Sequence, residues 1–347
     1  MRAVMYRDFG QRPELVEVDP PACPPRGAVV RVRATGLCRS DWHGWMGHDD
    51  VIALPHVPGH EFAGEVAELG GEVAEASGWR VGDRVTAPFI CACGRCDECR
   101  SGNEQVCEQQ RQPGFTHWGS FAEYVVVDEA ELNLIRLPDS LGFVEAASLG
   151  CRFATAYRAI IARGRLQPGE QVAVHGCGGV GLSAIMIAVA AGVPVFGVDV
   201  SEAALAAAAE LGAVPIQGGD GAAERIREAS GGGVDLSVDA YGSPETAFAS
   251  VRSLRTRGRH VQIGLMLADH AVAAMPMDAV IAGELEILGS HGMAAHEYPD
   301  LLGAVASEAF RPIELVGRRI GLDDVPEALA AMGRAGGGGS GMTVVEL

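Results

Sequence analysis

The chain has 347 residues, of which 48% are hydrophobic, and a formal net charge of -18 at pH 7. This length exceeds one ordinary core, so two domains are expected, with enough apolar residues to bury a sizeable core. The acidic excess argues against nucleic acid or an anionic membrane surface as a partner, because both would repel it. Neither a secretory signal nor an apolar run near the roughly 20 residues of a spanning helix is evident, so a cytoplasmic protein is expected.

Short β segments separated by Gly and Pro make up residues 1 to about 150. They are expected at Ala28–Ala34, Gly64–Leu69, Arg84–Ala87 and Ala122–Val127. This texture predicts an irregular, barrel-like β domain with loops. The cysteines and histidine that could bind a metal fall on or beside those loops.

Three residues of this region suit an open metal site. Cys38, His60 and Cys151 each lie in a Gly-flanked segment: T-G-L-C-R-S-D, P-G-H-E-F-A-G and L-G-C-R-F-A-T. Two sulfurs and one imidazole make three protein ligands, which leaves the fourth position of Zn²⁺ to water or substrate. The alternative is two buried thiols and a surface histidine, with no metal.

A compact cysteine run suits a closed metal site. It has the pattern C-x2-C-x2-C-x7-C and consists of Cys93, Cys96, Cys99 and Cys107. Four thiolates from one short loop satisfy a tetrahedral Zn²⁺ completely, so a structural zinc lobe is predicted over residues 91–107. A disulfide loop or redox cluster is the alternative, which a reducing compartment disfavours. The remaining thiols are interpreted as bystanders: Cys23, Cys91 and Cys177.

After Pro138 the pattern changes to alternating helices and strands. Helices are expected at Val144–Leu149, Thr155–Ala162, Ser201–Leu211 and Pro244–Leu254. Strands are expected at Gln171–His175, Val195–Asp199, Ala213–Ile216, Leu236–Ala240, His260–Gly264 and Ile287–Ser290. This alternation predicts an α/β fold with a Rossmann-type, doubly wound parallel sheet.

The tail after residue 291 is expected to return to the first domain. It carries a predicted helix at Val325–Met332, a turn at Gly336–Gly339 and a final strand at Met342–Glu346. The expected division is therefore a catalytic zinc domain over 1–152, a nucleotide-binding domain over 153–291, and the returning segment 292–347.

A glycine-rich turn follows the strand Gln171–His175 directly and opens the next helix. It reads Gly176-Cys177-Gly178-Gly179-Val180-Gly181. Such glycines allow a tight turn and close approach of a pyrophosphate to the helix N-terminus. Asp199 ends the next strand, where a carboxylate accepts hydrogen bonds from both ribose hydroxyls and repels a 2′-phosphate. NAD is therefore predicted over NADP; a turn that has lost its nucleotide is the alternative.

Four motifs in order resemble the zinc-dependent medium-chain alcohol dehydrogenase family, and the likeness covers essentially the whole chain. The motifs are Gly59-His60-Glu61-x-x-Gly64 with Gly70 and Val73, the cysteine run, the segment Cys38–His43, and Gly150-Cys151 with Thr155. The resemblance implies a GroES-like catalytic domain, two zinc ions per chain and NAD. It also implies that Cys38, His60 and Cys151 are the catalytic zinc ligands.

The resemblance assigns further roles near that zinc. Glu61 is implied to approach the metal when water leaves, and Asp41 to orient the ligand imidazole. The alternative for Glu61 is a salt-bridged carboxylate. Ser40 is placed to reach the alcohol oxygen, and His43 to pass the proton onward through the cofactor ribose. The implied substrate wall consists of Phe89, Trp45 and Trp118, although the two tryptophans suit the core equally well.

The implied cofactor contacts span both domains. Arg39 resembles the family's pyrophosphate contact, while some members carry another Arg near the C-terminus that the stretch G-G-G-G-S-G-M-T lacks. The remaining implied contacts are Thr155, Gly176, Gly178, Gly179, Val180, Gly181, Asp199 and Gly264. The short stretch from Cys107 to Gly119 favours a homotetramer over a dimer, by analogy with microbial members.

These residues support the hypothesis of an NAD-dependent zinc alcohol dehydrogenase of class EC 1.1.1.-. It would reversibly oxidise a small-molecule alcohol to an aldehyde or ketone, with hydride transfer to NAD from a zinc-bound alkoxide. Polyol, threonine or formaldehyde-type dehydrogenases and carbonyl, imine or alkene reductases share the fold and stay open. A nucleotide-sensing relative without catalysis would usually lack the open-site ligands.

Overall fold

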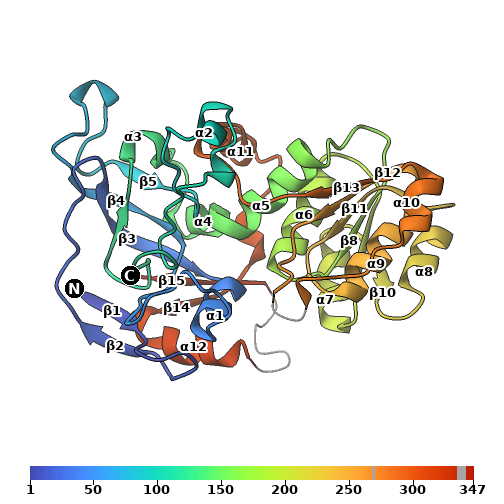
Figure 1. Ribbon diagram of the computed structural model, residues 1–347, viewed down its shortest axis with the longest axis horizontal. Helices are drawn as coiled ribbons and strands as arrows, with labels where there is room; N and C mark the ends of the chain where they lie inside the picture. The colour runs from blue at the N-terminus through green and yellow to red at the C-terminus, as the bar shows by residue number, and fades with distance from the viewer. Residues whose placement is uncertain (268–269, 334–340) are drawn as a thin grey trace. The chain divides into compact units, whose positions relative to one another are not determined.

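The computed structural model describes residues 1–267, 270–333 and 341–347 (Figure 1). Its contacts divide the chain into two units. Unit 1 comprises Met1–Ala154 and Gly292–Leu347, and unit 2 comprises Thr155–His291. The first change of unit falls two residues after the boundary expected from the sequence. The turn expected at Gly336–Gly339 lies outside the described residues.

Unit 1 is built around a seven-stranded sheet. The strand order is β14-β15-β3-β4-β5-β7, and β6 also pairs with β3. β14 and β15 are parallel, whereas the other neighbours are antiparallel. The strands are β3 (Ala28–Leu37), β4 (Glu61–Leu69), β5 (Arg84–Thr86), β6 (Tyr124–Val127), β7 (Ile135–Arg136), β14 (Val316–Gly321) and β15 (Met342–Glu346), with β1 (Arg2–Met5) and β2 (Glu14–Glu17) as a separate antiparallel pair.

Short helices flank this sheet. They are α1 (Arg39–Trp45), α2 (Asp97–Arg100), α3 (Ala130–Asn133), α4 (Phe143–Ser148), α11 (Tyr298–Ala306) and α12 (Val325–Ala331). α4 packs on β3 and β4 and continues through a π-helical turn, Leu149–Phe153, into α5 (Ala154–Arg158). Such π turns recur at functional sites, because the extra residue re-aims the side chains around it.

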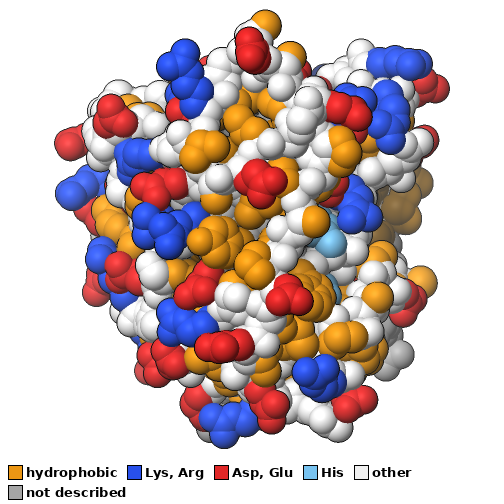
Figure 2. Space-filling model, turned by 90° about the vertical axis from the view of Figure 1, so that its left-hand side faces the viewer, with side chains coloured by type: hydrophobic (Ala, Val, Ile, Leu, Met, Phe, Trp, Pro, Cys, Tyr) orange, Lys and Arg blue, Asp and Glu red, His pale blue; other side chains and the backbone are white. Residues whose placement is uncertain are grey.

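Apolar side chains from β3 to β6 form one core of unit 1. Its members include Val30, Val32, Phe62, Val66 and Val125, all at most 2% exposed. On the surface, arginines pair with carboxylates, as Arg33 does with Glu65 at 2.6 Å. Figure 2 shows acidic and basic side chains interspersed among apolar ones on one face, so neither sign forms a continuous patch there.

Unit 2 is a six-stranded, fully parallel sheet with the order β10-β9-β8-β11-β12-β13. Its strands are β8 (Val172–His175), β9 (Val195–Asp199), β10 (Val214–Gln217), β11 (Val234–Asp239), β12 (Leu254–Gln262) and β13 (Glu286–Gly289). Its helices are α6 (Gly179–Ala190), α7 (Glu202–Glu210), α8 (Ala222–Ala229), α9 (Pro244–Arg252) and α10 (Met277–Gly283). The predicted Rossmann sheet is confirmed, and its order reverses between β8 and β11, where such folds bind ligands.

Local chemistry explains where helices of unit 2 begin. The Ser201 side chain accepts a hydrogen bond from Ala204 N and caps the start of α7. At the start of α9, the Ser243 side chain accepts from Thr246 N, and Pro244 occupies the first helical position. Among the described residues, each helix is too short or too polar to cross a bilayer.

Candidate active site

The expected open-site ligands lie at neighbouring strand ends of unit 1. Cys38 directly follows β3 and His60 directly precedes β4, and these strands pair with Gly36 opposite Glu61. Cys151 arrives from the π turn after α4, which packs on both strands. One ligand atom each from Cys38, His60, Glu61 and Cys151 all lie within 4.8 Å of one another. The structure thus brings together three residues that are far apart in sequence.

Asp41 fixes the orientation of the His60 imidazole. Its Oδ1 accepts from His60 Nδ1 at 2.9 Å, and its Oδ2 accepts from Cys38 N at 2.9 Å. The proton is therefore assigned to Nδ1, leaving a lone pair on Nε2. Nε2 is buried and has no hydrogen-bond partner among the described residues. A buried acceptor beside two thiols suits a metal cation, so the residues present fit Zn²⁺.

The pKa values of the two open-site thiols, Cys38 and Cys151, shift in opposite directions. The pKa of the Cys38 thiol lies well below its ordinary value, mainly because it accepts a hydrogen bond from Cys151 and also interacts with His60. The same hydrogen bond, together with burial, raises the pKa of Cys151. Full deprotonation of both thiols therefore needs an added cation, which a divalent metal provides.

Glu61 is paired with Arg152, a residue that sequence reasoning missed. Both side chains are buried, and their closest approach is 2.5 Å between Arg152 Nη2 and Glu61 Oε2. Burial raises the pKa of Glu61 while Arg152 opposes the shift. Burial alone would lower the pKa of Arg152, but the charge of Glu61 raises it. An arginine directly after the ligand in L-G-C-R-F was the signal available in the sequence.

Aromatic rings surround His60. The Phe89 ring lies 6.0 Å from it and the Phe115 ring 5.1 Å, measured between centroids. Phe89 is thus beside the ligands as expected for a substrate wall, while Phe115 was not predicted.

The two tryptophans expected in the substrate wall or the core both pack within unit 1. Trp45 is 7% exposed, belongs to the core cluster with Tyr6, Phe115 and Phe121, and donates to Gln11 O. The structure therefore favours the core alternative for Trp45. Trp118 packs against the cluster around Ala3 and donates to Pro55 O at 3.0 Å.

Two further residues of helix α1, Ser40 and His43, lie close to the ligands in sequence. The Ser40 hydroxyl is 3.7 Å from Cys38 Sγ. His43 Nδ1 lies 3.0 Å from Nδ1 of the exposed His48, and burial is the main cause that lowers the pKa of His43 to about 4. His43 is therefore neutral near pH 7 and can both accept and donate a proton. Sequence reasoning did not single out His48 for this site.

Arg39, expected at the pyrophosphate, makes its contacts inside unit 1. Its guanidinium stacks 4.4 Å from the Trp42 ring centroid and donates to Met332 O. Arg39 is exposed, so the guanidinium stays hydrated at the surface while one of its faces stacks on the indole ring.

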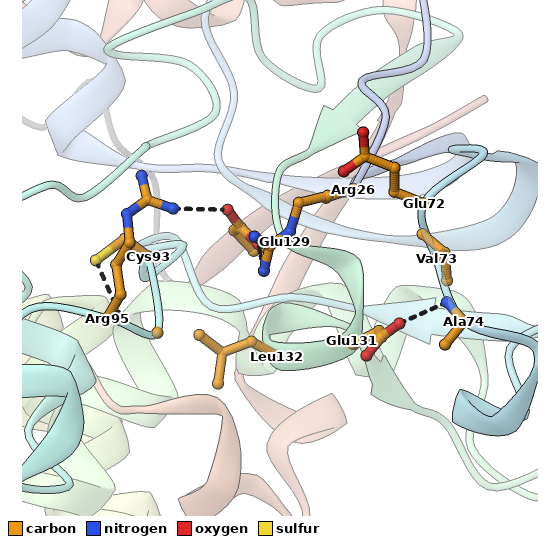
Figure 3. Close-up of a pocket in the computed structure, with 10 residues that line it drawn as sticks. Arg26, Glu72, Val73, Ala74, Cys93, Arg95, Glu129, Glu131 and Leu132 are labelled. Carbon is orange, nitrogen blue, oxygen red and sulfur yellow. Dashed lines mark hydrogen bonds and ion pairs between the residues drawn. The ribbon is translucent and has the colours of Figure 1, made fainter.

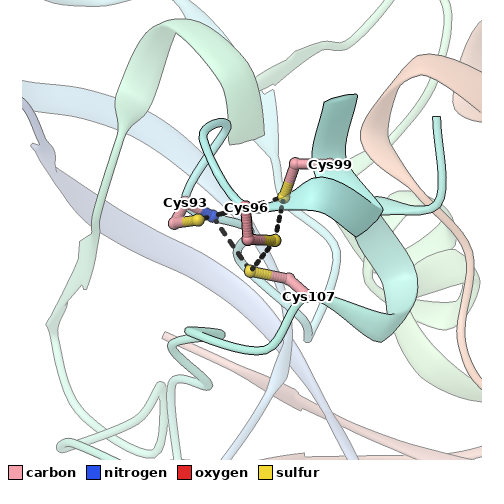
Figure 4. Close-up of side chains that lie close together, drawn as sticks. All are labelled: Cys93, Cys96, Cys99 and Cys107. Carbon is pink, nitrogen blue, oxygen red and sulfur yellow. Dashed lines mark hydrogen bonds between the residues drawn. The ribbon is translucent and has the colours of Figure 1, made fainter. Parts of the chain in front are cut away.

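The four cysteines of the structural lobe converge as predicted for a closed site (Figure 4). Cys96 Sγ lies 3.3 Å from Cys99 Sγ and 3.8 Å from Cys107 Sγ. These separations are far beyond a disulfide bond of about 2.05 Å. They are near the roughly 3.8 Å that separates sulfurs bound to one tetrahedral zinc at 2.3 Å. Backbone N–H groups also point at the sulfurs, such as Gln109 N at 3.3 Å from Cys107 Sγ.

Cys91 lies outside that cluster. Its thiol is buried in the core of the β sheet and donates to Pro88 O at 3.6 Å. Burial raises its pKa strongly, which keeps it a thiol.

A pocket of about 690 Å³ borders the structural lobe (Figure 3). Its wall includes Arg26, Arg95 and Glu129, and both arginines pair with Glu129, at 2.7 and 3.3 Å. Glu72 and Glu131 also line the pocket, so carboxylates outnumber guanidinium groups in this wall and it does not form a cradle for an anion. The open-site ligands are not part of this wall, and we assign the pocket no function.

The glycine turn of unit 2 has the geometry of a nucleotide-binding turn. Gly176 has φ +89°, and a Cβ there would meet the backbone of Tyr241 at 3.0 Å. A Cβ on Gly181 would lie 1.8 Å from Gly176 O, whereas Gly178 faces open space. The turn leads into the twelve-residue helix α6, with Gly179 and Val180 as its first residues. Backbone can thus approach a phosphate at this helix N-terminus.

Asp199 braces this turn from the end of β9. One carboxylate oxygen accepts from Cys177 N at 2.8 Å, and the other accepts from Ser201 N at 2.9 Å. Gly264 follows β12 and packs against the Gly242 backbone, where a Cβ would lie 2.3 Å from Gly242 N. Thr155 begins unit 2 and is 8% exposed.

Comparison with known families gives two matches along the chain. The alcohol dehydrogenase GroES-like domain matches residues 24–139, and the zinc-binding dehydrogenase domain matches residues 179–307. An alcohol dehydrogenase of Geobacillus stearothermophilus is 36% identical over 294 residues, 84% of each chain. The chain belongs to the zinc-dependent medium-chain alcohol dehydrogenase family. An NAD-dependent alcohol dehydrogenase of Sulfurisphaera tokodaii is 33% identical over 345 residues, 95% of each chain.

Solved structures give the same fold. An alcohol dehydrogenase from Thermus sp. ATN1 superposes with a TM-score of 0.89 at 30% identity, covering 100% of this chain and 99% of that one. The GroES-like and Rossmann architecture predicted from the sequence is thereby confirmed, and the family is one of oxidoreductases that use zinc and NAD.

Proposed function

We propose that this protein is an NAD-dependent zinc alcohol dehydrogenase that reversibly converts an alcohol to an aldehyde or ketone. The observation that carries the proposal is the convergence of buried Cys38 and half-buried Cys151 on the buried Nε2 of His60, which has no hydrogen-bond partner among the described residues. Its relatives named as alcohol dehydrogenases support it. A second zinc would be held by the four cysteines of the structural lobe.

When bound, the catalytic zinc would polarise the alcohol oxygen and lower its pKa. Asp41 would hold His60 in the ligating tautomer. Ser40, next to the ligand segment, would take up the hydroxyl proton by hydrogen bonding, and His43 with His48 would pass it to solvent. The Phe89 and Phe115 rings beside His60 would exclude water from the reacting centre.

The cofactor would bind unit 2 at the glycine turn, with its pyrophosphate at the N-terminus of α6. Asp199 would accept hydrogen bonds from the adenosine ribose, which favours NAD. Thr155, Gly264 and Arg39 would contribute further contacts. When bound, NAD would supply the hydride acceptor, a chemistry that belongs to the cofactor itself.

The proposal extends to substrate class and assembly. Two phenylalanine rings beside a ligand favour an alcohol with an apolar substituent over a polyol. We also propose a cytoplasmic homotetramer without nucleic-acid or membrane partners, on the acidic charge and the family resemblance.

The direct test changes the open-site ligands. Cys38→Ser and His60→Ala should each abolish alcohol oxidation while NADH binding to unit 2 stays within a few-fold of normal. Cys23→Ser, which alters a thiol outside both ligand sets, is the matched control. Turnover with NAD⁺ and NADP⁺ across primary, secondary and polyhydroxy alcohols, together with metal analysis, provides the readout. Full activity in a metal-depleted ligand variant would reject the mechanism.

A further inference from the structure

The ion pair between Arg152 and Glu61 is a built feature of the ligand region. Glu61 Oε1 accepts from Arg152 N and from Arg152 Nε, each at 3.0 Å, and Glu61 Oε2 accepts from Nη2 at 2.5 Å. Backbone and side chain of one residue thus occupy both carboxylate oxygens. The Glu61 side chain is fully buried and that of Arg152 is 8% exposed. Such forked, desolvated pairs have well-defined geometry.

Glycines make room for this pair. A Cβ on Gly36 would lie 2.1 Å from Glu61 Oε2 and 2.8 Å from Arg152 Nη2. A Cβ on Gly150 would lie 2.8 Å from the Glu61 Cα. The Glu61 side chain therefore packs directly against the backbone of Gly36 in β3 and of Gly150 in the π turn.

The charges around the ligands explain why the arginine is needed. With a divalent metal bound, two thiolates and the Glu61 carboxylate would carry three negative charges, which the metal and Arg152 would balance with three positive ones. Glu61 has an oxygen within 4.8 Å of the other ligand atoms. Without Arg152, the buried Glu61 carboxylate would be stabilised by binding another cation, because an unpaired buried charge is strongly destabilising. The metal would then be the nearest cation left.

We propose that Arg152 is a positioning residue that restrains Glu61 from becoming the fourth protein ligand, so that this position stays open to the substrate oxygen. This inference rests on the proposed function only in that a metal binds Cys38, His60 and Cys151. It restricts the movement of Glu61 toward the metal that the family resemblance implied.

Imidazole binding to the cobalt-substituted protein tests the proposal without relying on turnover. Imidazole competes for the open position, and the visible absorption of Co²⁺ reports its coordination. In Arg152→Gln the unpaired Glu61 should occupy that position and weaken imidazole binding by about tenfold or more. The double variant Glu61→Gln with Arg152→Gln should restore binding, since a neutral amide competes poorly for the metal. Arg163→Gln, in unit 2, is the control for loss of an arginine.

Each outcome decides the proposal. Unchanged imidazole binding in Arg152→Gln, or weak binding that persists in the double variant, would overturn it. If Arg152→Gln does not fold, Arg152→Lys keeps the charge without the fork, and intermediate weakening supports the proposal while wild-type binding overturns it. The proposed function fails separately, if the unaltered protein holds no cobalt at the three ligands or does not oxidise alcohols.

Discussion

At the scale of single residues, two buried histidines of unit 2 should make stability depend on pH. Burial is the main cause that lowers the pKa of His175 to about 3 and of His260 to about 4. The ordinary value in an unfolded chain is about 6.5. Between these values the unfolded state binds more protons, so the stabilisation is complete above pH 6.5 and is lost as pH falls toward 4 and 3.

The expected slope is up to about 1.4 kcal/mol per pH unit for each histidine in that window. Denaturant unfolding at pH 7, 6 and 5 measures it, and His175→Leu should reduce the slope because the Nε2 of His175 has no hydrogen-bond partner in the described structure. His270→Leu, at an exposed position, controls for the loss of a histidine. Equal slopes in the wild type and His175→Leu would contradict the prediction.

His43 provides a second residue-scale prediction, on rate. If it passes the substrate proton to His48, His43→Gln should lower kcat at pH 7 on the order of tenfold or more, because the amide cannot relay a proton. The loss should shrink as pH rises, since hydroxide can then remove the proton directly. The pH profile of kcat measures this, and a parallel drop at all pH values would indicate a structural effect instead.

Single residues also show what the sequence could and could not predict about the site. The convergence of Cys38, His60 and Cys151 was predictable because each lies in a Gly-flanked motif that resembles a ligand segment of the family. The place of Arg152 was not predictable, since it depends on how the π turn packs against β4. Nor was that of Phe115, whose loop brings its ring beside His60. Trp45 was ambiguous for the same reason: an aromatic residue near a ligand segment can face the core or the site.

At the scale of elements, the structural lobe should depend on its metal. It offers few apolar side chains of its own, and the sulfurs that would bind zinc form the centre of its cluster. Cys99→Ser should therefore lose one of two zinc ions per chain and expose residues 91–107 to proteases. Metal analysis and limited proteolysis measure this. Cys91→Ser should keep both zinc ions, and loss of zinc there would contradict the ligand assignment.

The glycine turn and Asp199 form a second element with a testable role. Asp199 accepts hydrogen bonds from Cys177 N and Ser201 N and so shapes the turn. In the proposed function its carboxylate would also contact the adenosine ribose. Asp199→Asn should raise KM for NAD⁺ by about tenfold and narrow the preference over NADP⁺. Steady-state kinetics with both cofactors measure the change. An unaltered preference would remove Asp199 from the ribose contact.

Strand positions in unit 2 were predicted well because buried parallel strands read as short apolar runs. The ends were less predictable. β12 begins at Leu254 rather than at His260, because Leu254 pairs with Val234 across a register shift. In unit 1, β3 extends to Leu37 and β4 begins at Glu61, so these strands reach the ligands themselves. That extension depends on pairing between distant segments, which sequence periodicity does not report.

At the scale of the whole molecule, each unit has its own core, and the proposed function gives each its own ligand, zinc for unit 1 and NAD for unit 2. Ligands stabilise only the folded unit that binds them. Calorimetry should therefore show that chelation of zinc lowers the transition of unit 1, while NADH raises that of unit 2. A single transition that responds equally to both would mean that the two units unfold as one.

The course of the chain through unit 1 affects how the protein is made. β15, at residues 342–346, pairs directly with β3, at residues 28–37, and separates it from β14. Unit 2 is complete once residue 291 has left the ribosome, and it can fold while synthesis continues. The sheet of unit 1 can be completed only about fifty residues later, when β15 is available to pair with β3. During that interval the ligand thiols of unit 1 would be exposed to free metal ions and oxidants, because the sheet that buries them is not yet complete.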